Sequence, residues 1–257
     1  MTTAYPALLG FDLETTGVDV ETDRIVTAAL VEVEDWGPVR RRSWLVDPGI
    51  PIPDGAAGVH GVTTEIARRD GMNSADAVAQ IADEIATALD SGQPLVIMNA
   101  PYDLTLLDRE CRRHGYTPVT EWLNWPNTPV VLDPLVLDKH IDPYRPGPRK
   151  LESLAAWYEV VLEDAHEASA DALAAVQVAL RILHGAPDPT AYGRRTTYRG
   201  HVVGRDLAEL HANQPQWHAA WAANYQQYLR RRNPTAVIDG SWPIRPLPTM
   251  NVAARAA

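Results

Sequence analysis

The sequence predicts an α/β fold in which a mixed sheet is covered by helices on both faces. Two observations carry this prediction. Three strand candidates lie close together near the N-terminus, and short apolar strand candidates then alternate with amphipathic helices. A third observation points to the functional edge, because polar residues directly follow two of the buried strands. Ligands in such folds bind at the carboxyl ends of the strands, so these residues are the candidates for a site.

The first three elements are expected to form an antiparallel meander. An apolar run over residues 7–14 is followed by strand candidates over 25–33 and 41–46. The dipeptide Gly37-Pro38 separates the last two, as expected for a turn. Residues 48–58 are rich in proline and glycine, and they predict a loop.

Helices and strands alternate after this loop. Helices are expected over residues 63–69 and 74–89, the second capped by its first residue, Ser74. The apolar face of this second helix consists of Ala77, Val78, Ile81, Ile85 and Leu89. A buried strand over 95–98 then leads into a helix that begins near Pro101, a residue favoured in the first helical turn.

A short strand over residues 130–132 precedes helices over 151–158 and 168–183. The run Gly185-Ala-Pro-Asp-Pro breaks this pattern, and we place a domain boundary there. The chain is therefore expected to consist of a first domain, residues 1–185, and a C-terminal extension, residues 186–257.

The C-terminal extension is expected to be helical and then proline-rich. A long helix is expected over residues 206–232, with Pro215 as a candidate break. The segment after it contains Pro234, Pro243, Pro246 and Pro248, and it is expected to be extended and loosely packed.

Composition limits the class of protein. The 257 residues include one cysteine, Cys111, which excludes an intramolecular disulfide and a zinc-binding cysteine cluster. Any metal should therefore be held by oxygen and imidazole ligands, which favours magnesium or manganese. The chain has no apolar run long enough to span a bilayer and no basic leader, so we expect a cytoplasmic protein without a membrane association.

The formal net charge of −10 argues against a protein that coats duplex DNA, since that mode of binding needs clustered lysine and arginine. The charge is uneven, however. Residues 1–185 carry 29 acidic and 14 basic residues, whereas residues 186–257 carry 4 acidic and 9 basic residues. The basic extension fits two interpretations: a surface for a polyanion or an acidic partner, or an arginine-rich surface that faces only solvent.

The candidate chemistry begins with Asp12 and Glu14 at the end of the first strand. Because they are two residues apart on a strand, their side chains point to the same face. Two carboxylates in such a position repel each other unless a cation lies between them. The pair therefore indicates a divalent metal site, although a solvated strand end has the same spacing.

Three more residues could complete such a site. Asp103 lies on the first turn of the helix that follows Asn99, where the helix dipole also favours a carboxylate and Asn99 is a plausible cap. His166 and Asp171 are five residues apart, one before and one on the first turn of the helix expected from Ala168. Each of these positions also has an ordinary structural explanation, so the case rests on their occurrence together.

Three segments resemble the three motifs of the DEDDh family of 3′–5′ exonucleases, typified by the epsilon proofreading subunit of bacterial replicative polymerase. They are Phe11-Asp-Leu-Glu-Thr-Thr-Gly17, Asn99-Ala-Pro-Tyr-Asp103 and His166-Glu-Ala-Ser-Ala-Asp171. His60-Gly61 resembles the family's His-Gly pair. The resemblance covers residues 7–183; Met98, Pro101 and Tyr102 depart from the usual residues, but none of them is a metal ligand.

This resemblance implies a ribonuclease-H-like fold and a two-metal exonuclease site. Asp12, Glu14, Asp103 and Asp171 would hold two Mg²⁺ or Mn²⁺ ions about 3.5 to 4 Å apart. Asp12 and Asp171 would contact the ion that carries the attacking water, and Asp12 would also contact the other ion. His166 would accept the proton from that water, a task suited to a side chain that titrates near neutral pH.

The resemblance also implies a set of residues that bind the substrate. Thr15 and Thr16 would hold the terminal nucleotide, and His60 would lie beside the penultimate nucleotides. The whole predicted set is Leu13, Thr15, Thr16, Gly17, His60, Asn99 and Tyr102. The expected partners are single-stranded DNA or frayed 3′ ends and a DNA polymerase.

Two other functions stay open at this point. One is an RNA-directed 3′–5′ exonuclease of the oligoribonuclease or RNase T kind, because the same acidic site can cleave either sugar. The other is a non-catalytic module that binds a polymerase, although a scaffold has no need of four acids and a histidine.

The extension carries an aromatic helix face of Trp217, Trp221, Tyr225 and Tyr228, at spacings of four, four and three. It could pack onto the first domain, which is the interpretation we favour. It could instead be a docking face for a polymerase or a single strand, with Arg230-Arg-Arg232 beside it.

Overall fold

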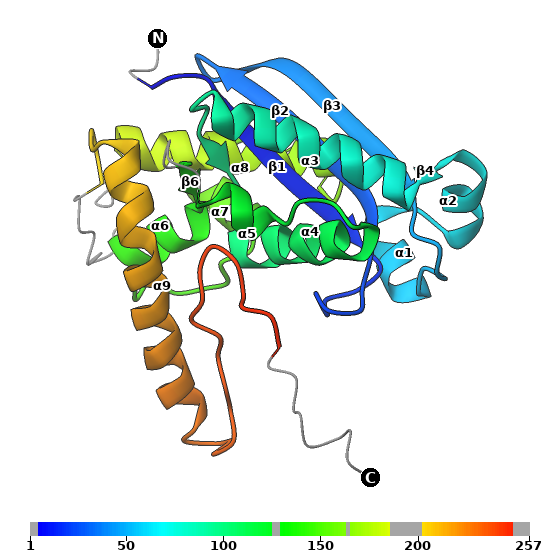
Figure 1. Cartoon of the computed structure of the whole chain (residues 1–257). Coiled ribbons are helices and arrows are strands. Elements are labelled where there is room, and N and C mark those ends of the chain that lie inside the picture. Colours follow the sequence, from blue (N-terminus) through cyan, green and yellow to red (C-terminus); the bar gives the residue numbers. More distant parts are fainter. Residues whose placement is uncertain (1–4, 125–128, 163–164, 186–201, 249–257) are drawn as a thin grey trace.

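The fold was determined as a computed structural model (Figure 1), which describes residues 5–124, 129–162, 165–185 and 202–248. Its strands are β1 Leu8–Thr15, β2 Ile25–Glu34, β3 Gly37–Asp47, β4 Met72–Asn73, β5 Leu95–Val96 and β6 Val131–Leu132. Its helices are α1 Asp54–His60, α2 Thr64–Asp70, α3 Ser74–Asp90, α4 Ala100–His114, α5 Val119–Trp122, α6 Pro134–Ile141, α7 Leu151–Trp157, α8 Ala168–His184 and α9 Leu207–Leu229. In the described part of the chain, no helix is long and apolar enough to cross a membrane.

The six strands form one mixed sheet in the order β4-β3-β2-β1-β5-β6. β1, β2 and β3 are antiparallel neighbours, whereas β5 and β6 run parallel to β1. The predicted meander and the mixed sheet are therefore confirmed. Since β1, β5 and β6 are parallel, their carboxyl ends lie at the same edge of the sheet.

Helices cover the sheet on both faces, as predicted (Figure 1). Alternate residues of β1 serve the two layers: Phe11 and Leu13 pack with α3 and α4, while Leu8 packs with α6, α7 and α8. The predicted apolar face of α3 is buried throughout. Burial of both faces removes most of the apolar surface from water, which stabilises the sheet between its helices.

Two predictions about residues 54–74 were wrong. Residues 54–60 form α1 where a loop was expected, because Ala56 and Ala57 pack against a small core of Val26, Ile52 and Ala67. This packing outweighs the low helix propensity of the glycines in the segment. The cap of α3 is Asn73, whose side chain accepts a hydrogen bond from the Ala75 amide, and Ser74 is the first helical residue.

α9 runs without a break through Pro215 and packs against the edge strand β6. Gln214 is buried there: its side chain accepts a hydrogen bond from the Asp133 amide at 2.7 Å and donates one to the Val131 carbonyl at 2.9 Å. His211 accepts a hydrogen bond from the Val131 amide at 3.1 Å. These side chains pair backbone groups that a further strand would otherwise pair.

The proline-rich segment after α9 is extended, but it is not loosely packed as expected. Trp242 is 8 % exposed and belongs to the core around α3 and α4, and Ile244 packs against the same core. The Arg245 amide donates a hydrogen bond to the Thr105 hydroxyl at 2.9 Å, and Arg109 donates to the Pro246 carbonyl at 2.9 Å. Burial of the tryptophan provides the attraction that the local sequence pattern does not show.

Candidate active site

Asp12 and Glu14 lie on the face of β1 that is covered by α8. Their side chains are partly buried, whereas Leu13 between them points into the opposite core. Gly10, on the same face as Asp12, lets α8 approach closely, since a Cβ there would lie 2.6 Å from the Ala172 carbonyl oxygen. This close contact of strand and helix brings Asp171, on the first turn of α8, beside the two carboxylates.

Asp103 reaches the site from α4 because β5 is short. β5 pairs with β1 only at Leu9 and Gly10, so no described strand pairs with the rest of β1 on that side. The Leu13 amide instead donates a hydrogen bond to Asp103 Oδ1 at 3.1 Å, and Asp103 is buried. The end of the strand ladder thus provides the place for the third acid.

His166 lies on the loop before α8 and faces the acids from outside. Its φ of 72° is in the left-handed region, an uncommon conformation for a residue other than glycine. Single ligand atoms of Glu14, His166 and Asp171 all lie within 4.8 Å of one another, so they could hold one metal ion. His166 Nε2 is also 3.5 Å from Glu152 Oε1, and the histidine side chain is 45 % exposed.

Burial and repulsion from nearby carboxylates raise the pKa values of all four acids. Burial, followed by repulsion from Asp103 and Asp171, raises the pKa of Asp12 well above its ordinary value. Burial and repulsion from Asp171 raise the pKa of Glu14 to about 7, and burial raises the pKa of Asp171 to about 6. Burial also raises the pKa of Asp103 well above its ordinary value, although the Leu13 amide opposes the shift.

One atom of this group tests whether a metal fits. Asp171 Oδ1 is buried and has no hydrogen-bond partner among the residues that the structure describes, which is costly for a carboxylate oxygen unless a cation contacts it. In the described part of the chain, none of the four acids forms an ion pair with lysine or arginine. Hard oxygen ligands with an unsatisfied negative charge suit Mg²⁺ or Mn²⁺, so these residues fit divalent cations.

A family model for exonucleases, RNase_T, matches residues 9–179, about two thirds of the chain. This chain belongs to the exonuclease family. The match confirms the predicted DEDDh resemblance, because all three motif segments fall within the matched residues.

Two curated relatives support this membership. The PolC-type DNA polymerase III of Lacticaseibacillus paracasei is 29 % identical over 162 residues, which cover 63 % of this chain and 10 % of the relative. A DNA polymerase III subunit epsilon-like protein of Rhodobacter capsulatus is 35 % identical over 103 residues, which cover 39 % of this chain and 14 % of that protein. The chain thus spans about a tenth of the length of the polymerases that it matches.

Solved structures support the fold. E. coli exonuclease I in complex with a dA16 oligonucleotide matches with a TM-score of 0.59 and 22 % identity, over 69 % of this chain and 41 % of that one. A zinc-bound form of the E. coli enzyme with single-stranded DNA also matches with a TM-score of 0.59. The predicted ribonuclease-H-like fold is confirmed.

The exonuclease domain places several predicted substrate residues around the turn after β1. The hydroxyl oxygens of Thr15 and Tyr102 lie 2.5 Å apart, and both contact the Gly17 carbonyl oxygen, at 2.7 and 2.5 Å. Thr16 is 2 % exposed, and its hydroxyl donates to Asp23 at 2.7 Å. A Cβ on Gly17 would lie 2.6 Å from Asp23 Oδ2, so a larger residue there would displace the carboxylate that Thr16 binds.

The remaining predicted substrate residues lie in three places. His60 is the last residue of α1, its Nδ1 accepts a hydrogen bond from the Val62 amide, and burial lowers its pKa. Asn99 is exposed, has a φ of 65° and does not cap α4 with its side chain. Leu13 is buried in the core on the side of β1 that faces away from Asp12. Their contacts with a substrate stay predictions.

Asp133 supports the site, although none of the sequence motifs includes it. Its carboxylate accepts hydrogen bonds from the Asn99 and Ala100 amides, both at 3.0 Å, and it also caps α6. It therefore fixes the first turn of α4, which carries Asp103. The pair Asp133-Pro134 after a buried strand is an N-cap followed by a first-turn proline, a signal that could have found it.

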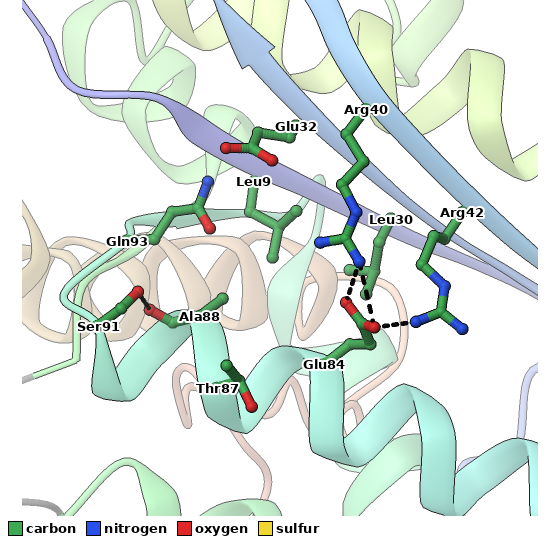
Figure 2. Close-up of a pocket in the computed structure, with 10 residues that line it drawn as sticks. All are labelled: Leu9, Leu30, Glu32, Arg40, Arg42, Glu84, Thr87, Ala88, Ser91 and Gln93. Atoms are coloured by element: carbon green, nitrogen blue, oxygen red, sulfur yellow. Dashed lines mark hydrogen bonds and ion pairs between the residues drawn. The ribbon is translucent and has the colours of Figure 1, made fainter.

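A separate hollow lies between the strands and α3, where none of the four site acids reaches. Its volume is about 120 Å³. Figure 2 shows Glu84 between the guanidinium groups of Arg40 and Arg42, with an ion pair to each. The negative charge of Glu84 is already paired by the protein's own arginines, unlike the charge of the site acids.

Proposed function

We propose that this protein is a two-metal-dependent 3′–5′ exonuclease that releases nucleoside monophosphates from the 3′ ends of single-stranded DNA. One observation carries the proposal: four carboxylates from β1, α4 and α8 gather with raised pKa values, and no lysine or arginine among the described residues forms an ion pair with them. The family membership and the names of the relatives, DNA polymerase III, favour DNA as the substrate.

The four acids, Asp12, Glu14, Asp103 and Asp171, are the residues that would hold the two ions. When bound, a pair of divalent cations lowers the pKa of a coordinated water and neutralises charge at the scissile phosphate. The raised pKa values serve this function, since a carboxylate that is unstable alone gains more from a cation than one that is already paired.

His166 is the base that accepts the proton of the attacking water. Its imidazole lies beside Glu14 and Asp171, at the open side of the site. Glu152, 3.5 Å from Nε2, and Asp171 both stabilise the positive charge that the imidazole gains with the proton. The exposed position of His166 lets the ring exchange that proton with solvent after each cycle.

The turn after β1 closes the site on the side of the leaving nucleotide. Thr15 and Tyr102 bind each other and the Gly17 carbonyl, so the turn is held in one conformation. We propose that this rigid turn positions the terminal sugar and base, together with His60 and Asn99. A prearranged contact lowers the entropy that the substrate loses on binding.

The proposal predicts that Asp12→Ala removes nearly all activity. The test is digestion of a 5′-labelled single-stranded DNA in Mg²⁺ or Mn²⁺, with products resolved by length, beside a matched RNA. Wild-type protein should shorten the DNA from its 3′ end and stop on addition of EDTA, whereas Asp83→Asn, a change of an exposed acid on α3, should behave as wild type. Equal activity of Asp12→Ala contradicts the metal assignment, and faster digestion of RNA makes RNA the substrate.

His166→Ala should separate the base from the metal ligands. We expect turnover to fall about 100- to 10,000-fold, because a general base contributes that much, while Mn²⁺ still binds to the four acids. The measurement is turnover together with Mn²⁺ binding by calorimetry. Unchanged turnover would mean that another group accepts the proton.

A further inference from the structure

The second half of α9 carries parallel aromatic rings. Trp221 and Tyr225 have ring centroids 5.5 Å apart and an interplanar angle of 19°, and Tyr225 and Tyr228 have centroids 6.3 Å apart at 14°. Tyr225 is 40 % exposed and Tyr228 is 54 % exposed, so the last two rings of this row, the aromatic ladder, are accessible to solvent. Trp217, one turn earlier, packs into the core instead. The sequence-based preference for packing thus holds for the first ring of the face and not for the last two.

Positive charge accompanies these rings. Lys139 of α6 places Nζ 3.1 Å from the centroid of the Trp221 ring, and the Arg231 guanidinium lies 5.9 Å from that of Tyr228. Between Leu210 and Ile238 the sequence contains no acidic residue, although the protein as a whole has a formal net charge of −10. The local charge therefore complements a polyanion.

A hollow of about 390 Å³ opens between α6 and α9 where the ladder begins. Its lining includes His140, which is stacked on Trp217 with ring centroids 3.8 Å apart, and the exposed Tyr144. A planar group could enter the hollow next to these rings, beside Lys139. The hollow and the ladder form one continuous surface, since Trp221 belongs to both.

The first half of the helix that carries this surface packs on the exonuclease domain, and the segment that follows the helix returns to that domain. Gln214 fixes the first half of α9 to the Asp133 amide, and Asp133 itself holds the start of α4. After α9 the chain returns to α4, where the Arg245 amide binds Thr105, two residues from Asp103 (Figure 1). The six residues from Asp133 to Lys139 span only about 9 Å along α6, at about 1.5 Å per residue. Lys139 therefore lies close to the residue that supports the site.

We propose that this surface, the aromatic ladder of Lys139, His140, Trp221, Tyr225, Tyr228 and Arg231, binds single-stranded DNA on the 5′ side of the end held by the acids. The inference rests on the proposed function, and it assigns a second contact with the same substrate. Bases of any sequence stack on tyrosine and tryptophan rings, while the lysine and the arginine neutralise phosphates. A polyanion of flat rings fits both properties, whereas an acidic protein partner would use the charge but not the parallel rings.

The test is binding of fluorescein-labelled oligothymidylate by metal-free protein in EDTA, measured by fluorescence anisotropy. The probes have about 20 and about 4 nucleotides, the latter near the smallest site size of single-strand-binding folds. The variants are Tyr225→Ala with Tyr228→Ala, the same pair changed to Phe, and Gln227→Ala. Gln227 is an exposed residue of α9 that lies about 200° around the helix from Tyr225, and it is the matched control.

The alanine pair should weaken binding of the longer probe at least about tenfold and leave the shorter probe unchanged, because a stacked base contributes that much. The phenylalanine pair and Gln227→Ala should bind as wild type. Arg231→Gln should lower the salt dependence of binding by about one phosphate contact. A longer probe that binds equally to the alanine pair and to wild type overturns the proposal, and such a result would be expected of a protein-docking surface.

Digestion in Mg²⁺ separates this proposal from the proposed function. A wild-type protein that binds the longer probe through the ladder but cannot shorten it contradicts the exonuclease mechanism and leaves the ladder in place. A wild-type protein that shortens both probes, with an unchanged KM for the alanine pair on the longer one, contradicts the ladder alone.

Discussion

α4 carries two groups of buried acids with opposite surroundings. Asp103, on its first turn, faces other carboxylates and one backbone amide. Asp108 and Glu110, one to two turns later, have fully buried side chains that contact arginines: Asp108 pairs with Arg109 and Arg112, and Glu110 pairs with Arg24 and Arg113.

The two groups differ in the source of the positive charge that compensates their buried carboxylates. Burial of a carboxylate costs several kcal/mol unless a cation compensates for the lost hydration. The chain itself supplies the compensating charge at Asp108 and Glu110, and the ion pair of Glu110 with Arg24 also ties α4 to the residue before β2. Asp103 is surrounded by further carboxylates instead. Their negative charge is stabilised only if the protein binds a cation there. Acid content alone does not distinguish the two groups, but their partners do.

The difference predicts opposite outcomes for two similar substitutions. Asp103→Asn should lower turnover about 100-fold or more and raise the melting temperature of the metal-free protein at pH 8, since it removes an unpaired charge. Glu110→Gln should cost about 3 to 5 kcal/mol of stability, because it leaves Arg24 and Arg113 unpaired, yet retain turnover per folded molecule. Thermal unfolding with EDTA and turnover with Mg²⁺ measure both. The comparison fails if both variants lose stability equally.

The stability of the metal-free protein should also depend on pH, because the site acids are unpaired. This effect is expected to be smaller than the effects of the two substitutions. The pKa values of Glu14 and Asp171 are raised by burial to about 7 and about 6, so the folded protein favours their protonated forms. Stability of the metal-free protein is therefore lost as pH rises from about 4, their ordinary range, to about 7. Mg²⁺ should raise the melting temperature by several degrees more at pH 8 than at pH 5.

The control for this measurement is Asp171→Asn, which removes one of the titrating groups. In this variant, the rise in melting temperature caused by Mg²⁺ should differ less between pH 8 and pH 5 than in the wild type. An equal Mg²⁺ effect at pH 5 and pH 8 in the wild type would show that the site acids do not compete with protons for the metal.

The sequence predicted most of the sheet, because strand and helix patterns depend on short spacings. The two-residue period placed Asp12 and Glu14 on one face, whereas Asp103 and Asp171 became candidates only through the resemblance of their motifs to a known family. The contacts it could not predict join residues far apart in the chain. Gln214 pairs with the backbone of β6, and Trp242 is buried against helices more than a hundred residues earlier.

Sequence patterns also did not predict the backbone conformation of two residues close to the site. Asn99 and His166 adopt positive φ values, of 65° and 72°, which direct the chain into the first turns of α4 and α8. Nothing in the composition of either loop requires these angles, because neither residue is glycine. Their positions next to Asp103 and Asp171 fit the tendency of strained residues to occur at functional sites.

Calorimetric titration of the metal-free protein with Mn²⁺ at pH 8 tests the central claim most directly, since it measures whether the four site acids bind cations. We predict binding of two ions per chain to the wild type and to Glu110→Gln, and a loss of at least one ion in Asp12→Ala. Binding that is absent in the wild type, or equal in Asp12→Ala, would contradict the account.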